Sequence, residues 1–107
     1  AFMKVNPRFQ KGNYERNIKR TDELRTMASD MGVSTSGLAI AWLLAKGDHV
    51  VPIPGTRSIE HLDELASGAD LDLSPSDIEA IEKVLPVGWC HGDRYTADQW
   101  QGPERYC

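Results

Sequence analysis

The stretch Asp48-His-Val-Val-Pro-Ile-Pro-Gly-Thr-Arg-Ser-Ile-Glu-His-Leu-Asp-Glu-Leu65 decides the fold of this chain. Its first part is β-branched and has no alternating polar partner, which is typical of a strand covered on both faces. Pro54-Gly55 ends that run, and from Ile59 the apolar positions recur with the spacing of a helix. The stretch therefore predicts a strand that includes Val50, Val51 and Ile53, then a turn, and then a helix that begins near Ile59.

The turn between this strand and helix has the chemistry of an anion site. Gly55 lets the backbone approach a ligand closely, and the N–H groups at a helix N-terminus favour negative charge. Thr56 and Ser58 add hydroxyls, and the planar guanidinium of Arg57 suits paired bonds to a phosphate. A solvated turn capped by Ser58 is the alternative, since Glu60 adds a carboxylate and the spacing is not that of a P-loop.

The composition is that of a single soluble domain. The chain has 107 residues, of which 40% are hydrophobic and 26% charged. No stretch approaches the roughly 18 to 20 apolar residues that cross a bilayer, and no signal pattern is present, so we expect a cytoplasmic protein with no membrane partner. The two cysteines, Cys90 and Cys107, imply no disulfide framework.

Charge is distributed unevenly along the chain. Residues 1–46 carry eight Lys or Arg against four acids, and the remainder carries four against twelve. A basic half raises the question of nucleic acid, but the net charge of −4 argues against it.

Residues on either side of the deciding stretch predict helices. Residues 1–12 are expected to be loop. Tyr14, Ile18, Leu24, Met27, Ala28 and Met31 recur near one face and predict a helix ended by Gly32. Ser34 or Thr35 caps a helix over residues 36–46 that is apolar all round and must be covered on several sides.

The C-terminal part begins with one more strong helix signal. Residues 69–73 alternate and are expected to be extended. Ser74-Pro75-Ser76-Asp77 then combines a hydroxyl cap, a proline in the first helical position and an acid at the capping-box position. The helix should run to residue 85 and stop at Pro86, and residues 87–107 form a tail without periodicity.

The predicted strand has no partner strand in its own chain. Neither residues 2–5 nor 71–73 resemble a central strand, so buried backbone groups of residues 49–53 would be unpaired. A continuous Val/Ile run also implies parallel neighbours that are reached by long crossovers. We therefore expect the chain to be a piece of a larger α/β domain, or to pair with a second chain.

The strand, turn and helix of the deciding stretch resemble a segment of a known protein family. Val51-Pro-Ile-Pro-Gly-Thr-Arg-Ser58, followed by Glu60-His-Leu-Asp-Glu-Leu65, is similar to the cofactor segment of the aldo-keto reductases, in the bacterial and plant-type branch. The resemblance covers almost the whole chain in order, through Pro7-Arg8-Phe9, Asn17, Gly32-Val33-Ser34, Ala41-Trp42-Leu43-Leu44 and Gly92-Asp93-Arg94-Tyr95.

The resemblance implies an α/β fold, namely the C-terminal part of a (β/α)8 TIM barrel that is mostly helical when taken alone. Residues 1–107 would form one segment of a single barrel domain, with a loop over 1–12, helices and the last strand over 13–86, and a tail over 87–107. In order, the mapping gives an extra helix (13–31), the seventh helix (36–46), the last strand (49–53), the eighth helix (59–68) and an extra C-terminal helix (75–85). Such barrels often bind phosphate beside their last strands.

The resemblance also implies a function, the reduction of aldehydes and ketones with NADPH. The cofactor-binding residues would be Ile53, Gly55, Thr56, Arg57, His61 and Glu64. Arg57 would hold the adenosine 2′-phosphate and favour NADPH over NADH, while His61 and Glu64 would contact the adenosine end. A solvated surface role is the alternative for these last two. Leu65 departs from the family, which usually has Asn there, and cannot hydrogen-bond the adenine.

The family's catalytic Asp, Tyr, Lys and His resemble nothing in this sequence and are expected on preceding strands. We therefore expect no catalytic residue here, and no reductase activity from this segment alone. Its partners would be the rest of the barrel and a small carbonyl substrate. Trp89 and Trp100 are candidates for the wall of the substrate mouth, with simple packing over the barrel as the alternative.

Two other functions have weaker support. Residues 28–34 have the Ala, Gly and Ser spacing of a helix-turn-helix, but the would-be reading helix over 36–46 offers no Arg, Asn or Gln. Cys90, His91, Asp93 and Cys107 lack the spacing of a zinc knuckle, so no metal is expected.

Overall fold

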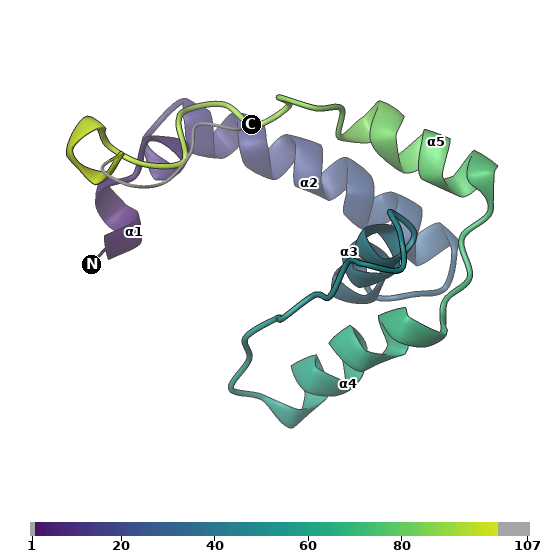
Figure 1. Ribbon diagram of the computed structural model, residues 1–107. Coiled ribbons are helices and arrows are strands. Elements are labelled where there is room, and N and C mark those ends of the chain that lie inside the picture. The colour runs from purple at the N-terminus through teal and green to yellow at the C-terminus, as the bar shows by residue number, and fades with distance from the viewer. Residues whose placement is uncertain (1, 101–107) are drawn as a thin grey trace.

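Helices make up the regular secondary structure of residues 2–100, the part of the chain that the computed structural model describes (Figure 1). The α-helices are α1 (Phe2–Val5), α2 (Asn13–Asp30), α3 (Thr35–Leu44), α4 (Ile59–Ser67) and α5 (Pro75–Val84). Three short 3₁₀ helices are η1 (Pro7–Phe9), η2 (Gly68–Asp70) and η3 (Ala97–Gln99).

Helix α2 confirms the predicted long helix and most of its predicted buried side, since Leu24 and Ala28 are buried and Met27 and Met31 pack against the core. Gly12 precedes it at φ 90°, and Gly32 follows it at φ 70°, as the sequence indicates for its end. Tyr14 and Ile18, predicted to be on the buried face, are 46% and 38% exposed. Asn17 is buried in their place, because its side chain amide is fully engaged in hydrogen bonds.

Helix α3 is covered on several sides, as its all-apolar sequence predicts. The Ser34 hydroxyl caps it by accepting a hydrogen bond from the Gly37 N–H at 2.9 Å. Leu38 is completely buried, and the helix contacts α2, α4 and η2. The contact with η2 is backbone to backbone, since a Cβ added to Gly68 would lie 2.4 Å from the Gly37 carbonyl oxygen.

Helix α5 begins at the predicted capping box. Asp77 donates its N–H to the Ser74 hydroxyl, and the Ser74 N–H donates to the Asp77 carboxylate at 2.9 Å. The Ser74 hydroxyl also donates to the Asp77 carboxylate at 2.6 Å, and this bond, followed by the one from the Ser74 N–H, holds the pKa of the Asp77 carboxyl below its ordinary value.

An ion pair ties the C-terminal end of α3 to α5. Lys46 pairs with the Glu82 carboxylate, the Trp42 indole N–H donates to the same oxygen at 3.3 Å, and the Lys46 ammonium lies 4.4 Å from the Trp42 ring centroid. The Lys46 hydrogen bond is the largest effect on the Glu82 carboxyl and holds its pKa below its ordinary value, against the opposing effect of burial.

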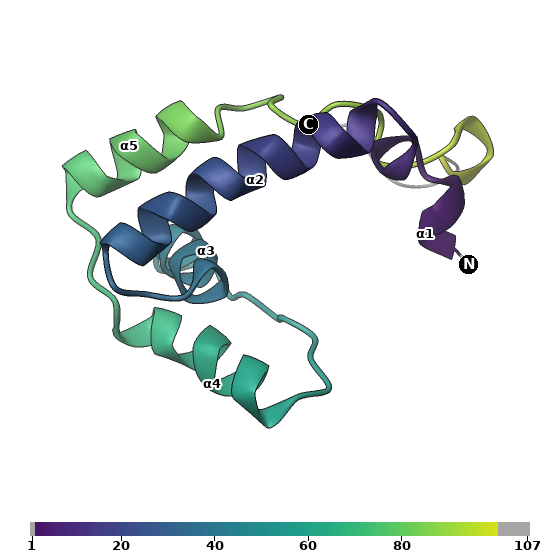
Figure 2. The same ribbon diagram turned by 180° about the vertical axis from the view of Figure 1, so that it is seen from behind.

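The hydrophobic core is small and lies where three helices meet. Its buried members come from α2, α3 and α5: Leu24, Ala28, Leu38, Ala41 and Ile81. The radius of gyration is 15.0 Å, against roughly 13 Å for a close-packed chain of this size. Figure 2 shows two segments that extend the molecule, namely the N-terminal end of α4 with the connection that precedes it, and α1 at the N-terminal end of α2.

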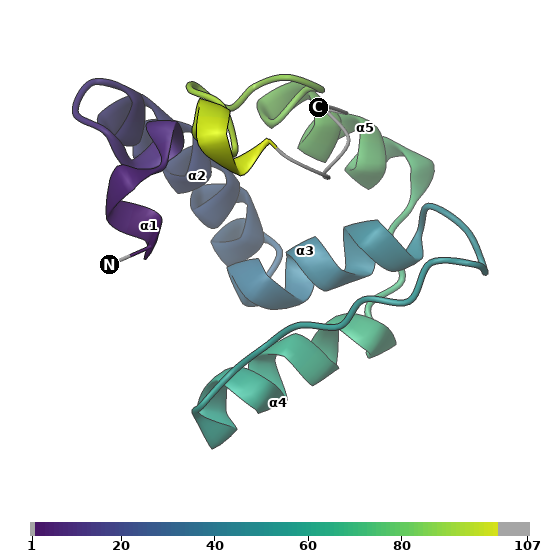
Figure 3. The ribbon, with the colours of Figure 1, turned by 60° about the vertical axis from the view of Figure 1, so that its left-hand side comes forward.

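The predicted strand over residues 49–53 is wrong for this structure. Residues 48–58 instead form a long irregular connection from α3 to α4 (Figure 3). Val51 and Ile53 are 78% and 92% exposed. The physical reason is the one that the sequence indicates: residues 2–100 contain no second strand to accept and donate the ladder hydrogen bonds.

The N-terminal residues and the segment that follows α4 also differ from prediction. Residues 2–5 and 7–9 form short helical turns instead of loop, with Pro7 in the first position of η1, where its fixed φ suits a helical start. Residues 69 and 70, predicted to be extended, instead belong to η2, in which Gly68 approaches α3 closely.

Substituting Gly68 tests the close approach of η2 to α3. Gly68→Ala places a Cβ against the Gly37 carbonyl and Ile40, so we expect a loss of about 1 to 3 kcal/mol in the free energy of unfolding, measured by urea denaturation. Gly55→Ala is the matched control, because a Cβ there meets nothing within 4 Å. Equal stability of the two variants would contradict the packing described.

The Glu82 ion pair predicts a pH dependence of stability. A carboxyl whose pKa is lowered by folding stabilises the fold fully above its unfolded pKa and loses that effect as the pH falls through the folded value. We expect Glu82→Gln to be less stable than the parent at pH about 6 and to lose less stability on acidification to pH about 3. Thermal unfolding at both pH values measures the stability of each protein. An equal loss of stability on acidification in the parent and in Glu82→Gln would refute the prediction.

Candidate cofactor-binding site

Four of the residues predicted to bind cofactor come together at the start of α4. Gly55, Thr56, Arg57 and His61 line one open hollow together with Ser58. The hollow lies where the connection from α3 turns into the helix, so backbone and side chains of the turn face the same space.

Two hydroxyls build this turn. The Thr56 hydroxyl donates to the Ser58 carbonyl oxygen at 3.3 Å and accepts from the Ser58 N–H at 3.2 Å. The Ser58 hydroxyl in turn caps α4 by accepting from the His61 N–H at 3.4 Å. The N–H groups of Ile59 and Glu60 come first in the helix, where no intrahelical carbonyl reaches them. A helix terminus of this kind attracts negative charge.

The charges around the hollow suit an anion with several acceptor oxygens. Arg57 is exposed and forms no ion pair with any residue of the described range 2–100, so its guanidinium is available. At Gly55 the space beside the backbone is open, since a Cβ would meet no atom within 4 Å. Glu60 is the opposing feature, an exposed carboxylate in the same helical turn.

The other two predicted cofactor residues lie outside this hollow. Glu64 lines an adjoining hollow with His61 and Arg25, and its carboxylate accepts a hydrogen bond from the Ser36 hydroxyl at 3.1 Å. His61 therefore borders both hollows. Ile53 is almost fully exposed on the connection and lines neither. Leu65, at the position where the family has Asn, is half-buried.

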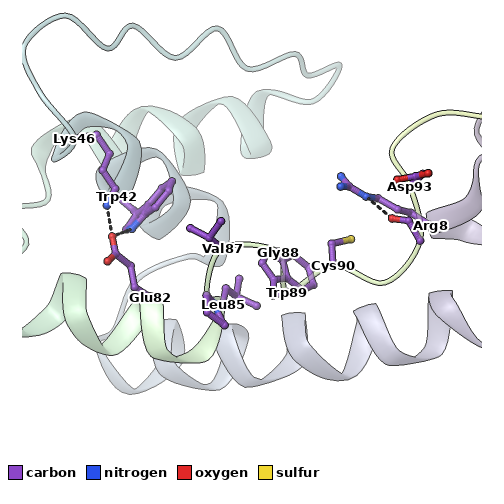
Figure 4. A pocket seen from close by; sticks show the side chains of 12 residues that line it. Arg8, Trp42, Lys46, Glu82, Leu85, Val87, Gly88, Trp89, Cys90 and Asp93 are labelled. Carbon is purple, nitrogen blue, oxygen red and sulfur yellow. Dashed lines mark hydrogen bonds and ion pairs between the residues drawn. The ribbon is translucent and has the colours of Figure 1, made fainter. Parts of the chain in front are cut away.

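Trp89 lines a different hollow, of about 1000 Å³, which shares no lining residue with that of Arg57. Figure 4 shows Trp42, Lys46 and Glu82 at one end of it, Arg8 and Asp93 at the other, and Trp89 between them. Trp89 also borders an apolar crevice whose other lining residues include Leu24, Leu38 and Ile81 of the core.

The other tail residues singled out by sequence are placed elsewhere. Trp100 packs edge-to-face on Tyr95, with ring centroids 5.3 Å apart, and is not among the residues lining the Trp89 hollow. Cys107 lies outside the described residues.

Sequence reasoning about the site missed Arg25, and it gave Asn17 and Arg8 no role. Arg25 carries no local motif, and only the fold brings it to the hollow of His61 and Glu64. Asn17 did leave a signal, because it precedes the buried Leu24 and Ala28 by seven and eleven residues on the same helix face. A polar residue on a buried face indicates a specific hydrogen-bonding role.

The structure gives the alternative functions no support. Helix α3, the would-be DNA-reading helix, is packed under α4 and η2, and the Ser36 hydroxyl near its N-terminus is bonded to a carboxylate. Residues 2–100 contain no cluster of three or more His, Cys, Asp or Glu that could hold a metal ion. Within the same range, no helix has the length and hydropathy to cross a membrane.

Comparisons with known proteins agree with the resemblance seen in the residues. The family model described as "Aldo/keto reductase family" matches residues 2–86. "Probable aldo-keto reductase 1" of Glycine max is 36% identical over 93 residues, which cover 87% of this chain and 27% of that protein. "Aldo-keto reductase yakc [NADP(+)]" of Schizosaccharomyces pombe is 31% identical over 94 residues, covering 88% of this chain and 28% of that protein.

The extent of these matches is as informative as their identity. The chain spans just over a quarter of the length of the two curated relatives. No solved structure matches it. Because the family model covers most of the chain, from α1 to the end of α5, this chain belongs to the aldo-keto reductase family.

Proposed function

We propose that this chain supplies the binding site for the phosphorylated adenosine end of NADPH in an oxidoreductase that reduces aldehydes and ketones to alcohols. The observation that carries the proposal is the hollow at the start of α4, where Gly55, Thr56, Arg57 and His61 meet. NADPH supplies the hydride for such a reduction. The printed name of the fission yeast relative, which includes NADP(+), supports this choice of cofactor.

The residues around the hollow would divide the binding between charge and hydrogen bonds. The Arg57 guanidinium would pair with the 2′-phosphate, which the first N–H groups of α4 also attract. His61 borders the adjoining hollow, where the Glu64 carboxylate is an acceptor for a ribose hydroxyl or the adenine amino group. Leu65 would contribute only apolar contact, because its side chain has no hydrogen-bonding atom.

We also propose that the chain works as the last part of a (β/α)8 barrel, with the remaining barrel polypeptide as its partner. The exposed Val51 and Ile53 support this, since parallel strands on both sides would cover them and pair their backbone. The catalytic residues would lie on those other strands, and Trp89 would face the carbonyl substrate. A cytoplasmic location belongs to the same proposal.

The cofactor proposal is tested by charge discrimination at Arg57. NADP+ and NAD+ are titrated against the full chain by calorimetry, and we expect NADP+ to bind at least about tenfold more tightly because of its additional phosphate. Arg57→Gln should reduce that ratio to near one. Arg20→Gln is the matched control, an exposed arginine paired with Glu23 on α2 and absent from both hollows. An unchanged ratio in Arg57→Gln would overturn the proposal.

The barrel proposal is tested by hydrogen exchange of the connection. The N–H groups of Val51 and Ile53 have no acceptor within residues 2–100, so they should exchange at nearly unprotected rates in this chain. In a protein that adds the rest of the barrel, we expect them to slow at least about a hundredfold. The Leu38 N–H, bonded to the Ser34 carbonyl, is the internal control. Equally fast exchange of Val51 and Ile53 in both proteins would exclude a strand here.

A further inference from the structure

A buried asparagine joins the tail to the N-terminal part of the chain. The Asn17 amide nitrogen donates to the His91 carbonyl oxygen at 3.0 Å, and its oxygen accepts from the His91 N–H at 2.8 Å. The same nitrogen donates to the Arg8 carbonyl oxygen at 3.2 Å. One side chain of α2 therefore binds the backbone of two other segments, at Arg8 and, 74 residues along the sequence, at His91.

Further bonds hold the same stretch of tail. Asn6 donates to the Arg94 carbonyl at 3.2 Å, and the Arg8 Nε–H donates to the Gly92 carbonyl at 3.2 Å. We call Asn6, Arg8 and Asn17, with the backbone of residues 91–94 that they bind, the tail clamp. Gly92 fits into it closely at φ 84°, since an added Cβ would lie 2.7 Å from the Asn13 amide nitrogen and 2.8 Å from the Pro7 carbonyl oxygen.

The clamp fixes position more than it adds stability. A buried amide is costly unless its donors and acceptor are paired, and here a polar side chain occupies a helix face that is otherwise apolar. Its pairing with both backbone groups of His91 is satisfied at only one placement of the tail, so the pair specifies that placement.

The residues just before the clamp form the wall of a hollow. The Trp89 N–H donates to the Pro86 carbonyl at 3.0 Å, which closes a turn directly after α5. Trp89 and Cys90 therefore lie between two fixed points, that turn and His91. Both line the hollow of Figure 4, whose far end is Arg8, a member of the clamp.

We propose that Asn17 is a positioning residue, which holds the tail so that Trp89 and Cys90 form one wall of the carbonyl-substrate mouth. The occupant of that mouth rests on the function proposed above. The positioning itself rests only on the tail clamp and is testable without any activity.

The first experiment measures tail placement by the reactivity of the half-buried Cys90 thiol. In the full chain carrying Cys107→Ser, the rate of alkylation by iodoacetamide is compared between the parent and Asn17→Ala. Loss of three hydrogen bonds should raise this rate about tenfold. Arg16→Ala, an exposed neighbour on α2, is the matched control and should leave it unchanged.

Two further variants separate positioning from a general loss of folding. Gly92→Ala opens the clamp from the tail side without changing a helix, and it should raise the Cys90 rate as Asn17→Ala does. Asn17→Asp keeps the size and the acceptor but removes the donors to the Arg8 and His91 carbonyls, so it should not rescue the parent rate. A parent-like rate in both Asn17→Ala and Gly92→Ala, with helix content retained by circular dichroism, would overturn the proposal.

The second experiment places Asn17→Ala and Gly92→Ala in a complete barrel with reductase activity. We expect the KM for the carbonyl substrate to rise about fivefold or more, with the KM for NADPH unchanged. Faster Cys90 labelling without a change in either KM would overturn the substrate-mouth role. If Arg57→Gln leaves the NADP+ to NAD+ affinity ratio unchanged while Asn17→Ala speeds the alkylation of Cys90, the cofactor proposal is refuted and the positioning by Asn17 stands.

Discussion

The absence of a polar face on α3 is the constraint on which the rest of the structure depends. A helix whose middle is Leu, Ala, Ile and Trp must be covered from several directions, and each cover is visible: α2 and α5 through Leu24 and Ile81, α4 and η2 through Gly68. The closest of these contacts is between Gly37 of α3 and Gly68 of η2, where the two backbones touch. The C-terminal end of α4 is fixed at this contact. Its N-terminal end, which carries the hollow of Arg57, projects from the rest of the molecule (Figure 3).

The candidate site combines a fixed helix start with an unpaired cation. Ser58 and Thr56 define the geometry of the turn with three hydrogen bonds, so the direction in which α4 presents its first N–H groups does not depend on a ligand. Arg57 has no ion-pair partner in the range 2–100, so its charged side chain can adjust to a ligand. The Trp89 hollow is separate from this site, because the two share no lining residue.

Local signals in the sequence were enough to predict α2, α3, α4 and α5, with the caps at Ser34 and Ser74 and, in the alternative interpretation of the turn, at Ser58. Ser34, Ser58 and Ser74 each accept the predicted type of capping bond, and the glycine after α2 adopts a positive φ. The grouping of Gly55, Thr56, Arg57 and His61 also followed, because a helix start keeps near neighbours in sequence close in space.

What the sequence did not predict depends on contacts between distant segments. The strand predicted over residues 49–53 is irregular because residues 2–100 contain no second strand, a lack that the whole sequence indicates and that the local run of Val50 to Ile53 does not. Asn17 is buried, while Tyr14 and Ile18 are not, because it hydrogen-bonds His91 in the tail, 74 residues further along the chain. Glu64 turns toward Ser36 because α3 and α4 pack together, and spacing within α4 carries no information about that contact.

The two prolines of the irregular connection have a consequence for how the chain behaves in a crowded solution. An exposed, apolar, β-branched run is a template for edge-to-edge association between molecules. Pro52 and Pro54 have no N–H group, and in an extended run they would lie on the same side, so that edge could not complete a hydrogen-bonded ladder with a neighbouring copy. In an extended run, Pro52 and Pro54 thus protect one edge of residues 50–54 against aggregation, while the N–H groups of Val51 and Ile53 lie on the other edge.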